Sequence, residues 1–88
     1  MNAPARQARS ACDNIKHAIV ITKNELASEK RQLKIAKQRL HDLQHEVPPN
    51  REKIAEAKAE VARLEEEITN TTDALATLEG IFSERCQA

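Results

Sequence analysis

Two histidines in the first half of the chain stand at a spacing that could hold a metal ion. His41 and His45 are four residues apart, so a helix would place both rings on one face. A transition-metal site needs further ligands, and the neighbouring Asp42 falls on another side of such a helix. We therefore expect a solvated histidine pair and predict no metal site and no cofactor.

The cysteines carry no signature of catalysis. Cys12 and Cys86 form no CxxC motif and have no histidine at a spacing typical of a thiol nucleophile, and no glycine-rich phosphate loop is present. The 88 residues include one Phe, no Trp and no Tyr, which leaves little for the walls of a substrate pocket. We predict that the protein is not an enzyme and has no catalytic residues.

A basic stretch in the first half could follow a phosphate backbone. Against this function, 14 Lys and Arg balance 14 Asp and Glu, and a single Phe offers almost no surface on which bases could stack. Nucleic-acid binding therefore stays an alternative function. Its predicted contact residues are Lys30, Arg31, Lys34, Lys37 and His41.

The composition indicates long helices, and one break divides them. Charged residues make up 32% of the chain, and there is one Gly. Pro48 and Pro49 cannot continue a helix, and Asn50 suits the N-cap of a following one. We predict a single helical-hairpin domain over 1–88, with helix one at about 5–47, a turn at 48–50 and helix two at about 51–85. Gly80 should not interrupt helix two, because apolar residues continue its pattern.

Heptad repeats run through both predicted helices and indicate a helical partner. A turn of two prolines makes the other half of the chain the nearest partner, so the fold class is all-α, an antiparallel coiled-coil hairpin. The a positions are Cys12, Ile19, Leu26, Leu33, Leu40 and Val47 in helix one, and Ile54, Val61, Ile68, Leu75 and Phe82 in helix two. The d positions are Ile15, Thr22, Glu29, Ala36 and Leu43, then Ala57, Leu64, Thr71, Leu78 and Arg85.

The flanking charges agree with this register. In an antiparallel pair, e positions face e positions and g positions face g positions, which brings opposite charges together. Each exposed pair is worth only about 0–1 kcal/mol, so such pairs select the register more than they stabilise it. The predicted pairs are Lys37–Glu65, Lys23–Glu79, Glu46–Lys53 and Arg39–Glu60.

The middle of the predicted seam is polar. Glu29 occupies a d position, and Thr71 and Thr72 lie opposite. A carboxylate in a seam is costly unless it is solvated or hydrogen-bonded. We expect Glu29 to reach water at the edge of the thin seam; the alternative is a polar layer, with a threonine as partner, that fixes the register or an oligomer contact.

The end of the hairpin far from the turn carries more apolar surface than one seam can cover. We predict a further helix–helix interface there, most simply a two-fold dimer that forms a four-helix bundle. The predicted oligomer or partner interface consists of Ile15, Ala18, Val20, Ile21, Ala74, Ile81 and Phe82. The predicted function is a non-enzymatic protein–protein interaction module, such as a small regulator, an inhibitor or an assembly adaptor.

The longest unbroken aliphatic run, Ala18–Ile21, is far too short for a membrane span or the apolar core of a signal peptide. We therefore predict a cytoplasmic location with no membrane partner. Because reducing compartments disfavour disulfides, we expect Cys12 and Cys86 to be thiols. The hairpin register nevertheless leaves them within about a turn of each other, so a disulfide is the geometric alternative.

Overall fold

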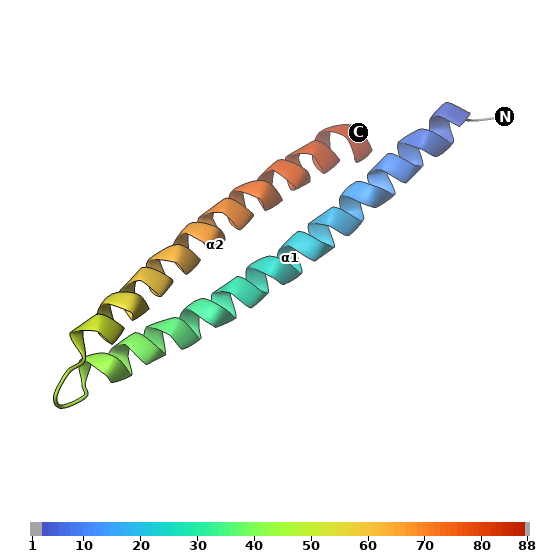
Figure 1. The fold of residues 1–88 in the computed structure, drawn as a ribbon. Helices are drawn as coiled ribbons and strands as arrows, with labels where there is room; N and C mark the ends of the chain where they lie inside the picture. The colour runs from blue at the N-terminus through green and yellow to red at the C-terminus, as the bar shows by residue number, and fades with distance from the viewer. Residues whose placement is uncertain (1–2, 88) are drawn as a thin grey trace.

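The computed structural model describes residues 3–87, with side chains from residue 10 onward, and consists of two long helices. Helix α1 spans Ala3–Gln44 and helix α2 spans Arg51–Cys86, and they lie side by side in opposite directions (Figure 1). The molecule is a rod with extents of 73 × 16 × 15 Å. Helix α2 continues through Gly80 as predicted. The all-helical hairpin is therefore confirmed.

Helix α1 ends at Gln44, three residues earlier than predicted. The residue before a proline disfavours helical geometry, so Val47 cannot be the last residue of the helix. Its side chain is 95% exposed and does not pack in the predicted a layer. The Val47–Pro48 peptide bond is cis. Asn50 caps α2 as predicted: its side-chain oxygen accepts a hydrogen bond from the Lys53 backbone N–H at 3.1 Å.

The seam between the helices buries d positions more deeply than a positions. Among residues 10–87, the buried hydrophobic side chains are Leu43, Ala57 and Leu64, all at d. The heptad register explains this difference: it places a large d residue opposite a small or polar one, as Leu43 opposite Ala57, whereas large residues lie opposite each other in the a layers. The d side therefore closes more tightly, and the large a side chains remain half-buried.

Glu29 is more deeply buried than the sequence-based expectation of a carboxylate at a solvated edge. It is only 8% exposed, and Thr71, at the d position of α2 in the same layer, is equally buried. The Glu29 Oε1 atom has no hydrogen-bond partner in the described part of the chain, so the predicted bond from a threonine is also missing. A polar layer is therefore present, and one oxygen of its carboxylate is buried without a hydrogen bond.

A disulfide joins Cys12 to Cys86 at the end of the hairpin opposite the turn. Their Cα atoms lie 5.8 Å apart, a separation typical of such bonds, and 74 positions separate them in the sequence. The expectation of free thiols was wrong, because it was based on an assumed reducing compartment and not on the distance between the two cysteines in the hairpin. The bond confirms the hairpin register at its far end.

None of the four predicted interhelical ion pairs forms in the described residues. The salt bridges there join Arg63 to Glu60 and to Glu67, within α2. Hydrogen bonds from Arg63 lower the pKa of the Glu60 carboxyl, and the same contact raises the pKa of Arg63. Long exposed side chains lose rotamer freedom when they pair across a seam, and a partner one turn away on the same helix costs less.

Candidate interaction surfaces

The register divides the surface of the hairpin into two long faces. Successive residues of a helix are about 100° apart, so a positions lie beside e positions and d positions beside g positions. In an antiparallel pair, both a rows fall on one side of the seam. We call this side the lysine face, because four successive e positions of α1 are Lys16, Lys23, Lys30 and Lys37. The side of the d and g positions is the opposite face.

The lysine face has an apolar floor that the hairpin covers only in part. Nine large aliphatic or aromatic a-position side chains run along it, and every one of them is half-buried. They are Ile19, Leu26, Leu33 and Leu40 of α1, and Ile54, Val61, Ile68, Leu75 and Phe82 of α2. The outer edge of α2 on this face is built from small b-position residues, namely Ala55, Ala62, Thr69, Ala76 and Ser83.

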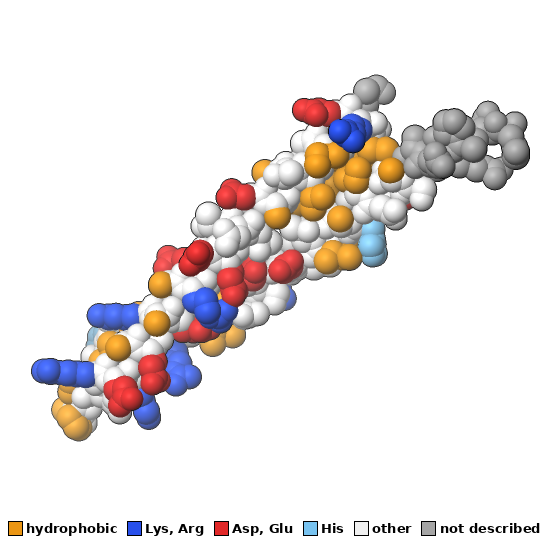
Figure 2. Space-filling view, turned by 45° about the horizontal axis from the view of Figure 1, so that its top comes forward, with side chains coloured by type: hydrophobic (Ala, Val, Ile, Leu, Met, Phe, Trp, Pro, Cys, Tyr) orange, Lys and Arg blue, Asp and Glu red, His pale blue; other side chains and the backbone are white. Residues whose placement is uncertain are grey.

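At the open end, the lysine face contains a hollow of about 480 Å³. Ile19, Val20 and Phe82 provide its apolar wall, and the Lys16 ammonium lies 5.7 Å from the centre of the Phe82 ring, within cation–π range. Lys23, Glu79 and Gln87 complete the lining. Figure 2 shows hydrophobic side chains gathered towards this end, whereas charged side chains crowd the middle and the turn.

The structure separates the two exposed large hydrophobic residues of the predicted interface. Val20 is 54% exposed and belongs to the lysine face, beside Phe82. Ile21 is 52% exposed, but its c position turns it towards the opposite face. The g-position residues Ala18, Ala74 and Ile81 lie on that opposite face as well, and Ile15 is half-buried in the seam. The seven predicted residues share one end of the rod but not one surface.

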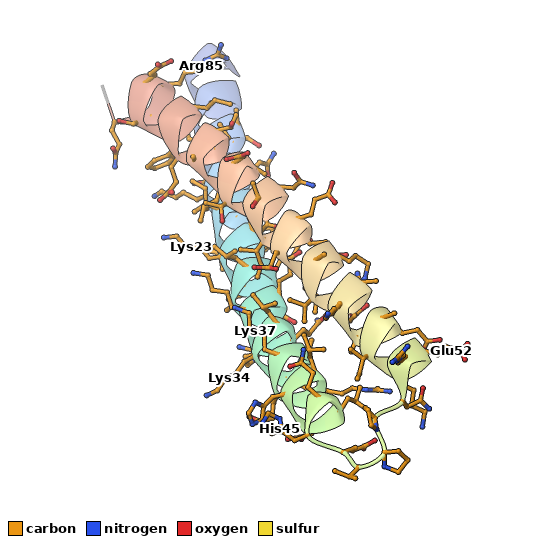
Figure 3. All side chains as sticks on the ribbon, turned by 90° about the vertical axis from the view of Figure 1, so that its left-hand side faces the viewer. Lys23, Lys34, Lys37, His45, Glu52 and Arg85 are labelled. Carbon is orange, nitrogen blue, oxygen red and sulfur yellow. A yellow bond between two sulfur atoms is a disulfide. The ribbon has the colours of Figure 1, made fainter. Side chains whose placement is uncertain are left out.

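The predicted basic stripe lies along the outside of α1 next to the lysine face. All five of its residues are exposed, and none of them takes part in a salt bridge among the described side chains. Figure 3 shows Lys23, Lys34 and Lys37 projecting from the same side of α1. Lys37, which the sequence assigned to Glu65, is thus available to another partner.

His41 and His45 stack against each other, with ring centroids 4.2 Å apart. The Nδ1 atom of His45 donates to the His41 backbone carbonyl at 2.7 Å, which turns this nitrogen away from any shared ligand. Within residues 10–87, no three His, Cys, Asp or Glu side chains gather in a metal-binding group.

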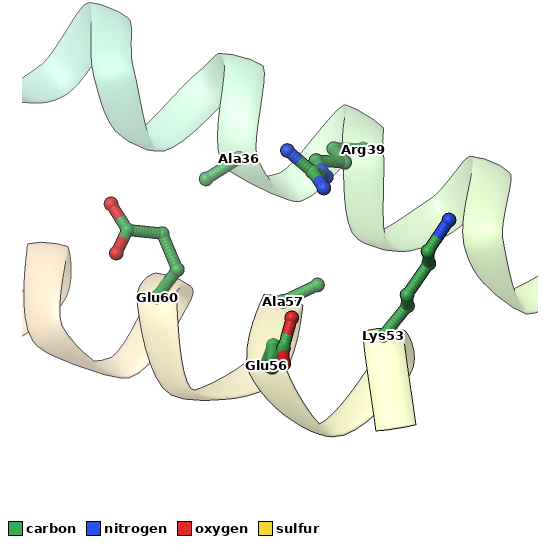
Figure 4. A pocket seen from close by; sticks show the side chains of 6 residues that line it. All are labelled: Ala36, Arg39, Lys53, Glu56, Ala57 and Glu60. Carbon is green, nitrogen blue, oxygen red and sulfur yellow. The ribbon is translucent and has the colours of Figure 1, made fainter. Parts of the chain in front are cut away.

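The opposite face has its own hollow of about 300 Å³ near the turn. The small side chains of Ala36 on α1 and Ala57 on α2 line its floor at different heights of the seam (Figure 4). Arg39, Lys53, Glu56 and Glu60 surround it and carry both signs of charge. The sequence interpretation missed one neighbouring feature, Ile35, which is 70% exposed; its c position two heptads after Ile21 could have pointed to it.

Comparisons of this chain with protein-family models, with curated proteins and with solved structures found no match. Within residues 3–87, neither helix holds an apolar stretch long enough to cross a bilayer.

Proposed function

We propose that this protein is a non-enzymatic interaction module whose helical hairpin self-associates and presents a rigid face to a protein partner. The observation that carries the proposal is the poor coverage of the seam. Along the lysine face nine large apolar side chains stay half-exposed, while only three hydrophobic residues of the described side chains are buried. A chain of this size with so few buried side chains usually requires a covalent staple, an oligomer or both.

The disulfide supplies the staple, and a second hairpin would supply the missing coverage. Two hairpins that share their half-buried rows form a four-helix bundle, in which each helix contacts two neighbours. A small regulator, an inhibitor and an assembly adaptor all fit this architecture. In each case the molecule acts by occupying or bridging a surface of another protein.

Charge placed at the open end, on both faces of the hairpin, tests this proposal. The variant Val20→Glu/Ile21→Glu should shift the protein from oligomer to monomer in sedimentation velocity, because both positions are more than half exposed in one hairpin. The matched control Asn24→Glu/Gln38→Glu adds the same charge at exposed f positions and should leave the oligomer intact. If the first variant keeps both its assembly state and its protein binding, neither face of the open end is an interface.

The disulfide weighs against the cytoplasmic location predicted from the sequence. Such bonds form and persist mainly in oxidising compartments, and the prediction of thiols depended on a reducing one. Alkylation of thiols in intact host cells, followed by mass measurement, tests the two locations. Unmodified, oxidised Cys12 and Cys86 would indicate an oxidising compartment, and alkylated thiols would restore the cytoplasmic location.

A second candidate function is nucleic-acid binding by the basic stripe, favoured by the absence of ion pairs at its exposed residues among the described side chains. Phosphate contacts release counterions, so this function requires binding that weakens steeply with salt. The variant Lys30→Glu/Arg31→Glu/Lys34→Glu should then abolish it.

The control for this test lies on α2. Arg51→Glu/Lys53→Glu/Lys58→Glu reverses the same number of exposed charges outside the stripe. Equal losses from both triple variants would indicate non-specific attraction, and no binding of duplex or single strands at low salt would exclude the function.

A further inference from the structure

We infer that a second copy of this chain covers the lysine face, with α1 of each copy against α2 of the other and with both turns at the same end of the dimer. This inference rests on the proposed self-association and adds its surface and its geometry. The inferred interface extends along the full length over which α1 and α2 pack together and is not confined to the open end.

The size of the lysine face suits such a contact. Helix α2 has 36 residues, or roughly 54 Å at about 1.5 Å per residue, and the rod is 16 Å wide. Each copy would therefore contribute on the order of 800 Å², the usual share of one partner in a stable interface. The small b row of α2 lets a second helix approach closely, and lysine stems can lie on alanine while their ammonium groups reach water.

Charge selects between the two possible two-fold arrangements. When the axis runs parallel to the helices, every residue keeps its height and α1 lies beside α2 of the second copy. Lys23 and Lys37 then face Glu79 and Glu65 of the second copy, within about one turn in height. All four side chains lack salt bridges in the described hairpin, so they are available for these contacts.

The other arrangement puts like charges together. When the axis runs across the helices, α1 meets α1 and α2 meets α2, with the two turns at opposite ends. The e-position lysine row of α1 would then lie along the lysine row of the second copy. Like-charge contacts across an interface are strongly disfavoured, so the arrangement with both turns at one end should prevail.

A single spin label at the turn tests the geometry on the full oxidised chain. Val47 is exposed, and the native cysteines are bonded to each other, so Val47→Cys offers one reactive thiol. Helices pack about 8–10 Å apart, so turns at the same end should give a label-to-label distance of roughly 20–30 Å in pulsed electron resonance. A distance near the 73 Å length of the rod would overturn the inferred geometry and keep the self-association. A signal with no defined distance would refute both.

Neutralising the lysines gives an independent test, because the dissociation constant should rise in one dimer arrangement and fall in the other. Lys23→Gln/Lys37→Gln removes attraction in the proposed dimer and should raise its dissociation constant roughly tenfold, since four contacts are lost across the axis. In the opposite-end dimer the same variant removes repulsion and should tighten association. The control Arg39→Gln/Lys53→Gln changes the opposite face and should have little effect. Tighter association of the first variant overturns the inference.

Discussion

Replacing the buried carboxylate of Glu29 by leucine should stabilise the protein. The side chain is 8% exposed, and its Oε1 atom has no hydrogen-bond partner in the described residues. An unsatisfied buried polar atom costs about 1–3 kcal/mol, and a fully buried leucine contributes about 1.5–3 kcal/mol. Because the neighbouring Thr71 limits the apolar contact, we expect a net gain of about 2 kcal/mol, which raises Tm by roughly 8–16 °C.

Equilibrium unfolding followed by circular dichroism measures this gain, with all variants at one protein concentration because association shifts apparent stability. Glu29→Ala removes the carboxylate without adding a large side chain, so it isolates the desolvation contribution. Glu66→Leu adds a leucine at an exposed f position and should change stability by less than about 0.5 kcal/mol. A loss of stability in Glu29→Leu would contradict the reasoning and would indicate that the carboxylate has a stabilising partner in the assembled protein.

Three further perturbations test other parts of the fold. Reducing the Cys12–Cys86 disulfide should lower the free energy of unfolding by about 4 kcal/mol, because the bond closes a loop of 74 positions and so restricts the unfolded chain. Denaturant titration with and without reductant measures this loss. Leu64→Ala at the best-buried position of the seam should cost about 3 kcal/mol in the same assay, and a loss below about 1 kcal/mol would mean that the seam does not stabilise the hairpin. The pKa of Glu60 is lowered by its hydrogen bond from Arg63, so that contact stabilises the fold above the ordinary carboxyl pKa and is lost as pH falls through the lowered value. Arg63→Gln should therefore be less stable than the parent at neutral pH, with a difference that disappears in acid; a difference that persists there would contradict the assignment.

The fold was predictable because strong local signals agree. The proline pair admits no continuous helix, and heptads of both halves fix a register that places Cys12 and Cys86 side by side. The end of α1 was less predictable, since the heptad pattern continues to Val47 while the following proline excludes it from the helix. The oxidation state of the cysteines depends on the compartment, which the register does not reveal.

The candidate surfaces were predictable only in part. The excess of apolar residues at the open end is visible in the sequence, but Val20 and Ile21 diverge by a helical step of about 100° and belong to different faces. The predicted interhelical ion pairs do not form, because matching heights bring opposite charges near each other without requiring them to make contact. Exposed side chains are flexible, and the free energies of alternative ion pairs differ little. The unequal burial of the a and d rows, which leaves the floor of the lysine face half-exposed, depends on the side-chain sizes that meet in each layer.

The molar mass of the oxidised, unmodified chain over a wide range of concentration tests self-association most directly. Sedimentation equilibrium or native mass spectrometry should find twice the mass of one chain, with dissociation only on dilution. A folded hairpin that keeps the mass of one chain at every concentration would contradict the account.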